Sequence, residues 1–197
     1  MILNIHGYMG NQHNTLFNIL TDLGVNQQDI LSPQIDYDST DPERVIKNLS
    51  VIIENNSRDV ELIIANSFGG FFGYMLAAKY SIPIILVNPC LMPFITIYSI
   101  SETYNPKFKR ALLLMFGSNM WTLPLSLCTV IVGTDDNIID HEKITYPLLP
   151  CTWYNVIKGM NHSISDNDIE AVRNIVDKAI QHYRKNGTTI LKQIGEL

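Results

Sequence analysis

The sequence predicts an α/β fold, a three-layer α/β/α sandwich built on a doubly wound, mostly parallel six-stranded sheet. Short apolar runs rich in β-branched residues alternate with segments of helical period along the whole chain. Charged residues make up 17% of the 197 residues and hydrophobic ones 46%, as expected for a sheet covered on both faces. Because no linker, repeat or low-complexity tract interrupts this pattern, we expect residues 1–197 to form a single domain.

The strands and helices are expected in strict alternation. Strands are predicted at 2–5, 30–35, 60–65, 83–87, 128–132 and 152–156, and Pro33 interrupts the second of them. Helices are predicted at 13–23, 41–56, 68–80 and 166–186. The last ten residues receive no assignment.

Local signals support the helix boundaries. Asp41, Pro42 and Glu43 supply a cap, a first-turn proline and an N-terminal negative charge to the second helix. In the last helix, apolar residues recur at helical spacing before an expected end at Gly187. The connection 89–127 is long enough for one or two helices and for a small cap, because connections of this length are usually functional.

The distribution of charge argues against nucleic acid and membranes as partners. A net charge of −5 with a single short basic run, at 107–110, argues against nucleic acid. Three uncharged windows, at 62–78, 80–101 and 111–134, suggest membrane spans, but prolines or glycines interrupt the second and third. The N-terminus lacks the features of a signal peptide, so we expect a cytoplasmic protein without membrane contact.

The three cysteines are expected to be small core residues. Cys90, Cys128 and Cys151 are odd in number and widely spaced, which fits neither a disulfide framework nor a metal site. The sequence does not indicate an oligomeric state.

The most informative motif surrounds one serine. The strand 60–65 leads through Ser67 directly into the helix 68–80, and small residues are needed two positions before and after such a serine. Gly69 meets this need, and Ala65 stands where the G-x-S-x-G pattern has its first glycine, one methyl larger. The pattern predicts a nucleophile elbow. The alternative is that Ser67 only caps the helix.

A nucleophilic serine needs a base and an acid that orients the base. The strand 128–132 leads to three candidate acids, of which we favour Asp136, followed by an apolar pair, over Asp135 and Asp140. The loop after the last strand carries His162 as the candidate base. The order Ser67, aspartate, His162 is that of α/β-hydrolases. An aspartate cluster after a strand can also be no more than a solvated turn.

The loop after the first strand, which begins at His6, is the candidate oxyanion site. Acyl transfer needs two N–H donors for the developing negative charge. The backbone amides of Phe68 and of Tyr8 or Met9 are the candidates. We expect His6 to brace this loop. The remaining histidines are expected at the surface: His13, His141 and His182.

The chain resembles the α/β-hydrolases and, more narrowly, the small YqiA-type esterases. The matching stretches lie at 6–8, 66–70, 87–93, 136–140 and 159–162, and Val-Asn-Pro at 87–89 is the most specific of them. That family usually has an arginine where this chain has Met92, so the resemblance does not extend to anion binding there. It implies an esterase with Ser67 as nucleophile, His162 as base and Asp136 as orienting acid, without metal or organic cofactor.

We therefore expect a serine hydrolase that cleaves small acyl esters or thioesters through an acyl-enzyme. The expected acyl-binding side chains are Met9, Met92, Phe94 and Tyr98, for which ordinary core or loop packing is the alternative. Two other functions stay open, namely a non-catalytic binding scaffold that uses the same cleft and an acyltransferase that uses the same triad.

Overall fold

A computed structural model describes residues 1–56, 60–100, 106–117, 123–150 and 153–195 of the chain. Within these ranges, the side chains of residues 97–100, 106–108 and 187–195 are outside the description.

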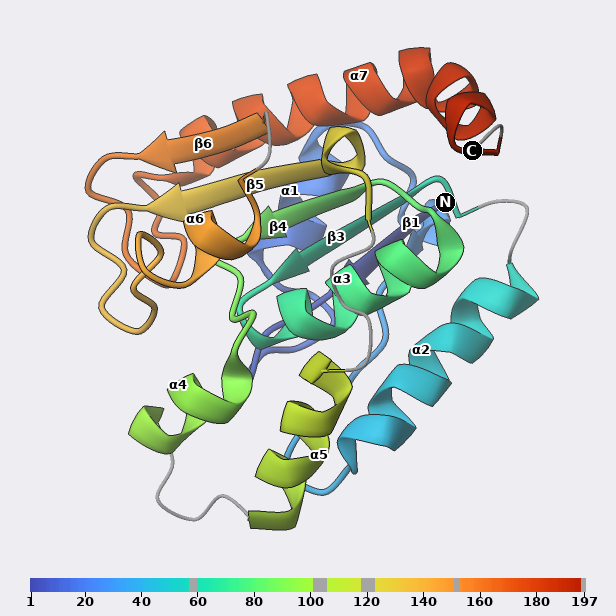
Figure 1. Cartoon of the computed structure of the whole chain (residues 1–197). Helices are drawn as coiled ribbons and strands as arrows, with labels where there is room; N and C mark the ends of the chain where they lie inside the picture. The colour runs from blue at the N-terminus through green and yellow to red at the C-terminus, as the bar shows by residue number, and fades with distance from the viewer. Residues whose placement is uncertain (57–59, 101–105, 118–122, 151–152, 196–197) are drawn as a thin grey trace.

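Six strands form one sheet in the order β2-β1-β3-β4-β5-β6 (Figure 1). They are β1 (Ile2–Ile5), β2 (Ile30–Leu31), β3 (Leu62–Asn66), β4 (Ile84–Val87), β5 (Cys128–Gly133) and β6 (Trp153–Ile157). Every neighbouring pair is parallel, which confirms the predicted sheet and makes it parallel throughout. The strand expected at 30–35 is shorter, because Pro33 has no N–H for the ladder and the chain after Leu31 leaves the sheet.

Helices cover both faces of the sheet, as the predicted sandwich requires (Figure 1). One face packs against α1 (Thr15–Asp22) and α7 (Ile169–Gly195). The other packs against α2 (Pro42–Asn55), α3 (Phe68–Tyr80), α5 (Pro106–Gly117) and the short α6 (Thr145–Leu148). The helix α4 (Pro93–Ile100) follows β4 and contacts α5. Both α4 and α5 lie in the long connection for which one or two helices were predicted.

The start of α2 follows its local sequence signals, whereas the end of α7 does not. The side chain of Asp41 accepts a hydrogen bond from the amide of Glu43 at 3.0 Å, so α2 begins where the sequence predicts. The expected end of α7 at Gly187 is wrong, since the helix continues to Gly195 through most of the unassigned segment. A single glycine costs a helix only about 1 kcal/mol and does not by itself stop it.

The topology indicates that a ligand would bind at the carboxyl ends of the strands. The chain leaves β1 outward to β2 and then crosses back over β1 to β3, so the strand order reverses between β1 and β3. Ligands of open α/β sheets bind at the carboxyl ends of the strands beside such a reversal.

Among the helices that the structure describes, none is long and apolar enough to cross a membrane.

We predict that Gly69→Ala destabilises the fold. A Cβ at Gly69 would lie 2.5 Å from the carbonyl oxygen of His6 and 2.6 Å from that of Ile5, so α3 and β1 would have to move apart. We expect a loss of roughly 1–3 kcal/mol in the free energy of unfolding. The matched control is Gly117→Ala, also in a helix, where a Cβ has nothing within 4 Å and a small gain is expected. Urea unfolding of both variants measures the difference, and equal stabilities would contradict the close approach.

Candidate active site

Ser67 occupies a strained turn between β3 and α3. Its φ of 49° and ψ of −126° are a conformation that costs a non-glycine residue about 1–3 kcal/mol. Hydrogen bonds hold it there, since its N–H donates to Val87 at 3.0 Å and its carbonyl accepts from Gly70 and Cys90 at 2.9 Å each. The side chain makes no hydrogen bond that caps α3, so the capping alternative does not describe it.

A glycine of α3 makes room for Ala65, which stands at the first glycine position of the motif. A Cβ placed on Gly73, one helical turn after Gly69, would lie 2.9 Å from the Cβ of Ala65. The missing side chain at Gly73 therefore leaves the room that the extra methyl of Ala65 takes. This compensation lets α3 pack on β3 as closely as the turn at Ser67 requires.

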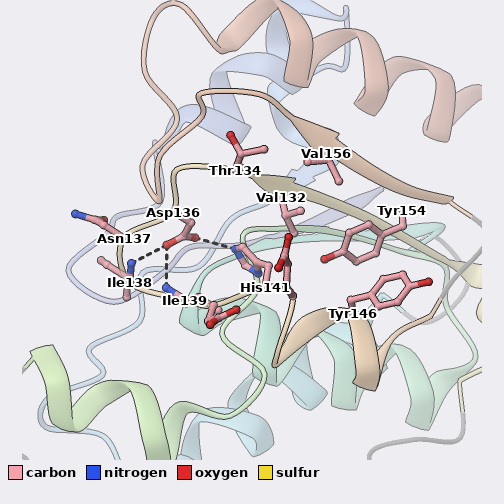
Figure 2. A pocket seen from close by; sticks show the side chains of 13 residues that line it. Val132, Thr134, Asp136, Asn137, Ile138, Ile139, His141, Tyr146, Tyr154 and Val156 are labelled. Atoms are coloured by element: carbon pink, nitrogen blue, oxygen red, sulfur yellow. Dashed lines mark hydrogen bonds and ion pairs between the residues drawn. The ribbon is translucent and has the colours of Figure 1, made fainter.

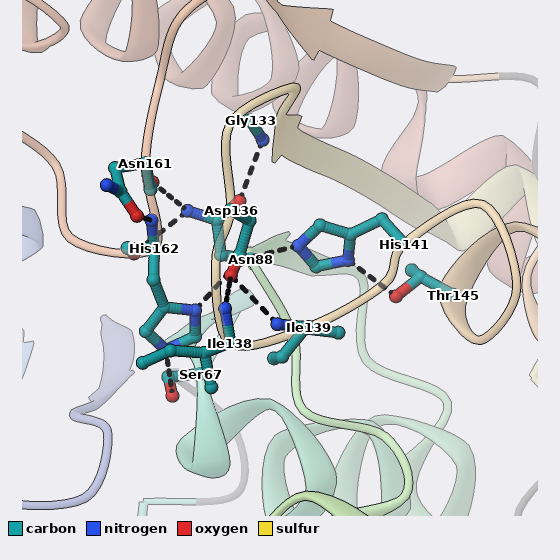
Figure 3. Close-up of polar contacts among 10 residues, drawn as sticks. All are labelled: Ser67, Asn88, Gly133, Asp136, Ile138, Ile139, His141, Thr145, Asn161 and His162. Carbon is teal, nitrogen blue, oxygen red and sulfur yellow. Dashed lines mark hydrogen bonds and ion pairs between the residues drawn. The ribbon is translucent and has the colours of Figure 1, made fainter.

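A chain of hydrogen bonds connects three residues that are far apart in the sequence (Figure 3). The Oγ of Ser67 lies 2.7 Å from Nε2 of His162. The Nδ1 of the same ring lies 2.8 Å from Oδ2 of Asp136. A hydroxyl, an imidazole and a buried carboxylate in this order can remove the hydroxyl proton and stabilise the imidazolium that results.

The structure brings Asp136 to His162 and leaves the other two candidate acids elsewhere. Asp135 is exposed and accepts a hydrogen bond from the hydroxyl of Thr134 at 2.7 Å. Asp140 is exposed and pairs with Lys143 at 2.6 Å.

All four described contacts of Asp136 come from hydrogen-bond donors. Its Oδ1 accepts from the amides of Ile138 and Ile139 at 2.9 Å each, and its side chain is only 1% exposed. Burial by itself raises the pKa of this carboxyl, but the hydrogen bonds from His141, His162 and these amides outweigh it and hold the pKa well below its usual range. The carboxylate is therefore ionised at neutral pH despite its burial.

The expectation that His141 lies at the surface is wrong. Its side chain is 6% exposed, and its Nε2 lies 2.8 Å from Oδ2 of Asp136, the same oxygen that His162 contacts. Its Nδ1 lies 2.7 Å from the hydroxyl of Thr145 at the start of α6. The spacing of five residues from Asp136 carried no signal in the sequence, because the loop between them has no regular period. His182 is also not a simple surface residue, since its ring packs 4.4 Å from that of Trp153.

Asn88 fastens the two loops that carry Asp136 and His162. Its Nδ2 donates to the carbonyls of Asn161 and His162 at 2.9 Å each, and its Oδ1 accepts from the amide of Gly133, also at 2.9 Å. The residue is 1% exposed and has a φ of 42°, which asparagine tolerates better than most residues. The sequence singled out Val-Asn-Pro as a family match without assigning this role to the asparagine.

The loop after β1 lies directly against the serine. A Cβ on Gly7 would be 2.8 Å from that of Ser67, and the Gly7 amide donates to the side chain of Asn66 at 3.0 Å. His6 braces the loop as expected, accepting from the amide of Ile35 at 2.9 Å. On the helix side, Phe68 begins α3, and the first amides of a helix have no partner within it.

The expected acyl-binding residues differ in exposure. Met9 is 86% exposed on the loop after β1, and Met92 is partly buried against the core. Phe94 is buried, with its ring 5.1 Å from that of Phe116. The side chain of Tyr98 lies outside the described residues.

A cavity of about 910 Å³ opens on the side of Asp136 that His141 occupies (Figure 2). Its walls come from the end of β5, from β6, from the loop after β5 and from α6. Its lining includes Asp136, His141, Ile138, Tyr146 and Tyr154, whereas Ser67 and His162 do not line it. In the part of the chain that the structure describes, no three or more His, Cys, Asp or Glu side chains form a group able to hold a metal ion.

Solved structures of similar architecture share little sequence with this chain. The mouse protein called alpha/beta hydrolase domain-containing protein 10 matches with a TM-score of 0.68 and 13% identity, over 92% of this chain and 89% of its own. An esterase of M. tuberculosis matches with a TM-score of 0.62 and 14% identity, over 91% and 84%. A structure described among carboxylesterases of Nitrososphaera gargenis matches with a TM-score of 0.58 and 15% identity, over 94% and 91%. At this identity they show the fold, which is that of the α/β-hydrolases.

A comparison with curated protein sequences gives no match. The model of one protein family, described as the uncharacterised protein family UPF0227, matches residues 1–115. The match spans β1 to α5 and so includes the loop after β1, the turn at Ser67 and the Asn88 segment. With the α/β-hydrolase fold, it confirms the assignment that the YqiA-type resemblance suggested, and the chain belongs to the family UPF0227.

Proposed function

We propose that this protein is a serine hydrolase that cleaves small acyl esters or thioesters. The single observation that carries the proposal is the continuous hydrogen-bonded chain Ser67–His162–Asp136, with contacts of 2.7 and 2.8 Å. The strained turn at the serine supports it, because such a turn lifts the hydroxyl clear of the sheet.

The proposed reaction has two half-reactions. His162 accepts the proton of Ser67 while Oγ attacks the acyl carbon, and the resulting imidazolium donates that proton to the leaving alcohol or thiol. A water molecule, deprotonated by the same ring, then attacks the acyl-enzyme, and the acid leaves as Ser67 regains its proton. The hydrogen-bond donors around Asp136 keep its carboxylate ionised. The carboxylate orients the imidazole of His162 and stabilises its charged form.

The oxyanion would be held between the loop after β1 and the start of α3. The backbone amides of Phe68 and of Tyr8 are the proposed donors, because the loop lies against Ser67 and Phe68 is the first residue of the helix. We further propose that α4 and α5, within 89–127, form a small cap. Met9 and Met92 are the proposed contacts for a short acyl chain.

Replacing the serine should abolish covalent labelling. A fluorophosphonate probe reacts with an activated serine, and we expect it to label the wild type at Ser67 and to leave Ser67→Ala unlabelled. Intact-protein mass spectrometry followed by peptide mapping measures the label. The control is Ser81→Ala, a serine at the far end of α3. Equal labelling of wild type and Ser67→Ala would rule out Ser67 as the nucleophile. An absence of labelling in the wild type would do the same.

The acid should be Asp136 and not its neighbour. We expect Asp136→Asn to lower kcat roughly 10³–10⁴-fold, because an amide can neither stabilise the imidazolium nor hold the correct tautomer. Asp135→Asn changes only an exposed contact with Thr134 and should stay within about twofold. Initial rates on p-nitrophenyl acetate compare the two, and the opposite ranking would transfer the role to Asp135.

The substrate class is tested by product analysis. We expect hydrolysis to be fastest with short acyl chains in a series of p-nitrophenyl esters and acyl thioesters. Adding an alcohol or thiol acceptor distinguishes the acyltransferase alternative, because a transferase would release the acceptor ester in place of the free acid. Release of free acid with acceptor present is the expected outcome.

A further inference from the structure

Two histidines bind the same oxygen of one buried carboxylate. Nε2 of His141 and Nδ1 of His162 each lie 2.8 Å from Oδ2 of Asp136, and they approach from opposite sides of the carboxylate (Figure 3). Only one of these rings reaches Ser67. The second ring needs its own explanation, because burying a histidine is unfavourable unless its nitrogens are hydrogen-bonded.

The surroundings of His141 fix which nitrogen carries its proton. Nε2 faces a carboxylate oxygen that can only accept, so it must be the donor. In the neutral imidazole, Nδ1 then accepts from the hydroxyl of Thr145, a fully buried residue. The chain of hydrogen bonds therefore runs from Ser67 through His162, Asp136 and His141 to Thr145.

His141 and Asp136 both line the cavity of about 910 Å³. The side chain of Asp136 is nevertheless only 1% exposed and that of His141 only 6%, and Nε2 of His141 is hydrogen-bonded to Oδ2. Without this donor, Oδ2 would keep a single described partner, His162, and could turn toward the cavity. Buried polar networks depend strongly on every member being satisfied.

We propose that His141 is a positioning residue for the proposed hydrolase reaction, acting through Asp136. Its Nε2–H fixes the orientation of the carboxylate and takes a share of its negative charge, so that Oδ2 stays directed at Nδ1 of His162. Thr145 holds the tautomer of His141 that makes this possible. The inference rests on the proposed function for its catalytic consequence, but the shared oxygen can be tested without turnover.

The first experiment measures the hydrogen bonds themselves. Imidazole N–H protons that donate to a carboxylate resonate far downfield of amide protons. We expect two such proton signals in the wild type, one from each ring. His141→Phe should remove one signal and shift the other. His182→Phe, which removes a histidine packed on Trp153, should leave both unchanged. Two unchanged signals in His141→Phe would overturn the proposal whether or not the protein is a hydrolase.

The second experiment measures the catalytic consequence. In His141→Phe the ring volume stays but the donor is lost, and we expect kcat on p-nitrophenyl acetate to fall roughly tenfold with KM within about twofold. Gln has its amide nitrogen the same number of bonds from Cα as Nε2 of histidine, so His141→Gln should recover kcat to within about threefold of wild type. A merely structural role predicts no such difference between Phe and Gln.

Thr145→Val keeps the test decisive should His141→Phe fail to fold. Valine has the shape of threonine and removes only the hydroxyl, so we expect kcat to fall about threefold and the His141 signal to shift or vanish. If Thr145→Val retains wild-type kcat and leaves both downfield signals unshifted, His141 does not position Asp136. Loss of a signal in a protein whose wild type shows no esterase activity would instead contradict the proposed function alone.

Discussion

Helix α3 can approach β1 and β3 closely, and the arrangement at the carboxyl edge depends on that approach. Two glycines of α3 permit it, since a Cβ on Gly69 would meet the β1 backbone and one on Gly73 would meet Ala65. The chain has a positive φ at Ser67, between β3 and α3, and a hydrogen bond to β4 helps to hold it there. A larger residue at either position would move the helix and with it the serine, the amide of Phe68 and the contact with the loop after β1.

The second constraint is electrostatic. Asp136 is almost completely buried yet ionised, and four donors from His141, His162 and two backbone amides offset the cost of burial. Asn88 contributes no charge, but it fixes the loops on either side of this carboxylate through three hydrogen bonds. The geometry of the site therefore depends on polar side chains that follow four different strands, and each of them hydrogen-bonds a residue that belongs to another of these strands or its loop: Ser67, Asn88, Asp136 and His162.

Much of the fold could be predicted because its signals are local. Strand runs, the cap at Asp41 and the strand-turn-helix motif at Ser67 each involve a few neighbouring residues, and five of the six strands lie within two residues of their expected bounds. The exceptions also have physical reasons. The strand expected at 30–35 is ended by Pro33, and α7 continues through Gly187 because one glycine is a weak helix breaker.

The sequence by itself determined the alternation of elements, the buried cysteines at 90 and 128, and the order of a serine, an aspartate cluster and a histidine along the chain. Only the tertiary structure decided which of three neighbouring aspartates faces the histidine, that Asn88 ties the loops together, and that His141 is buried on Asp136. The physical reason is the same in each case. These residues lie in irregular loops, where no period relates sequence position to direction, so their contacts are set by how separate strand ends meet at one edge of the sheet.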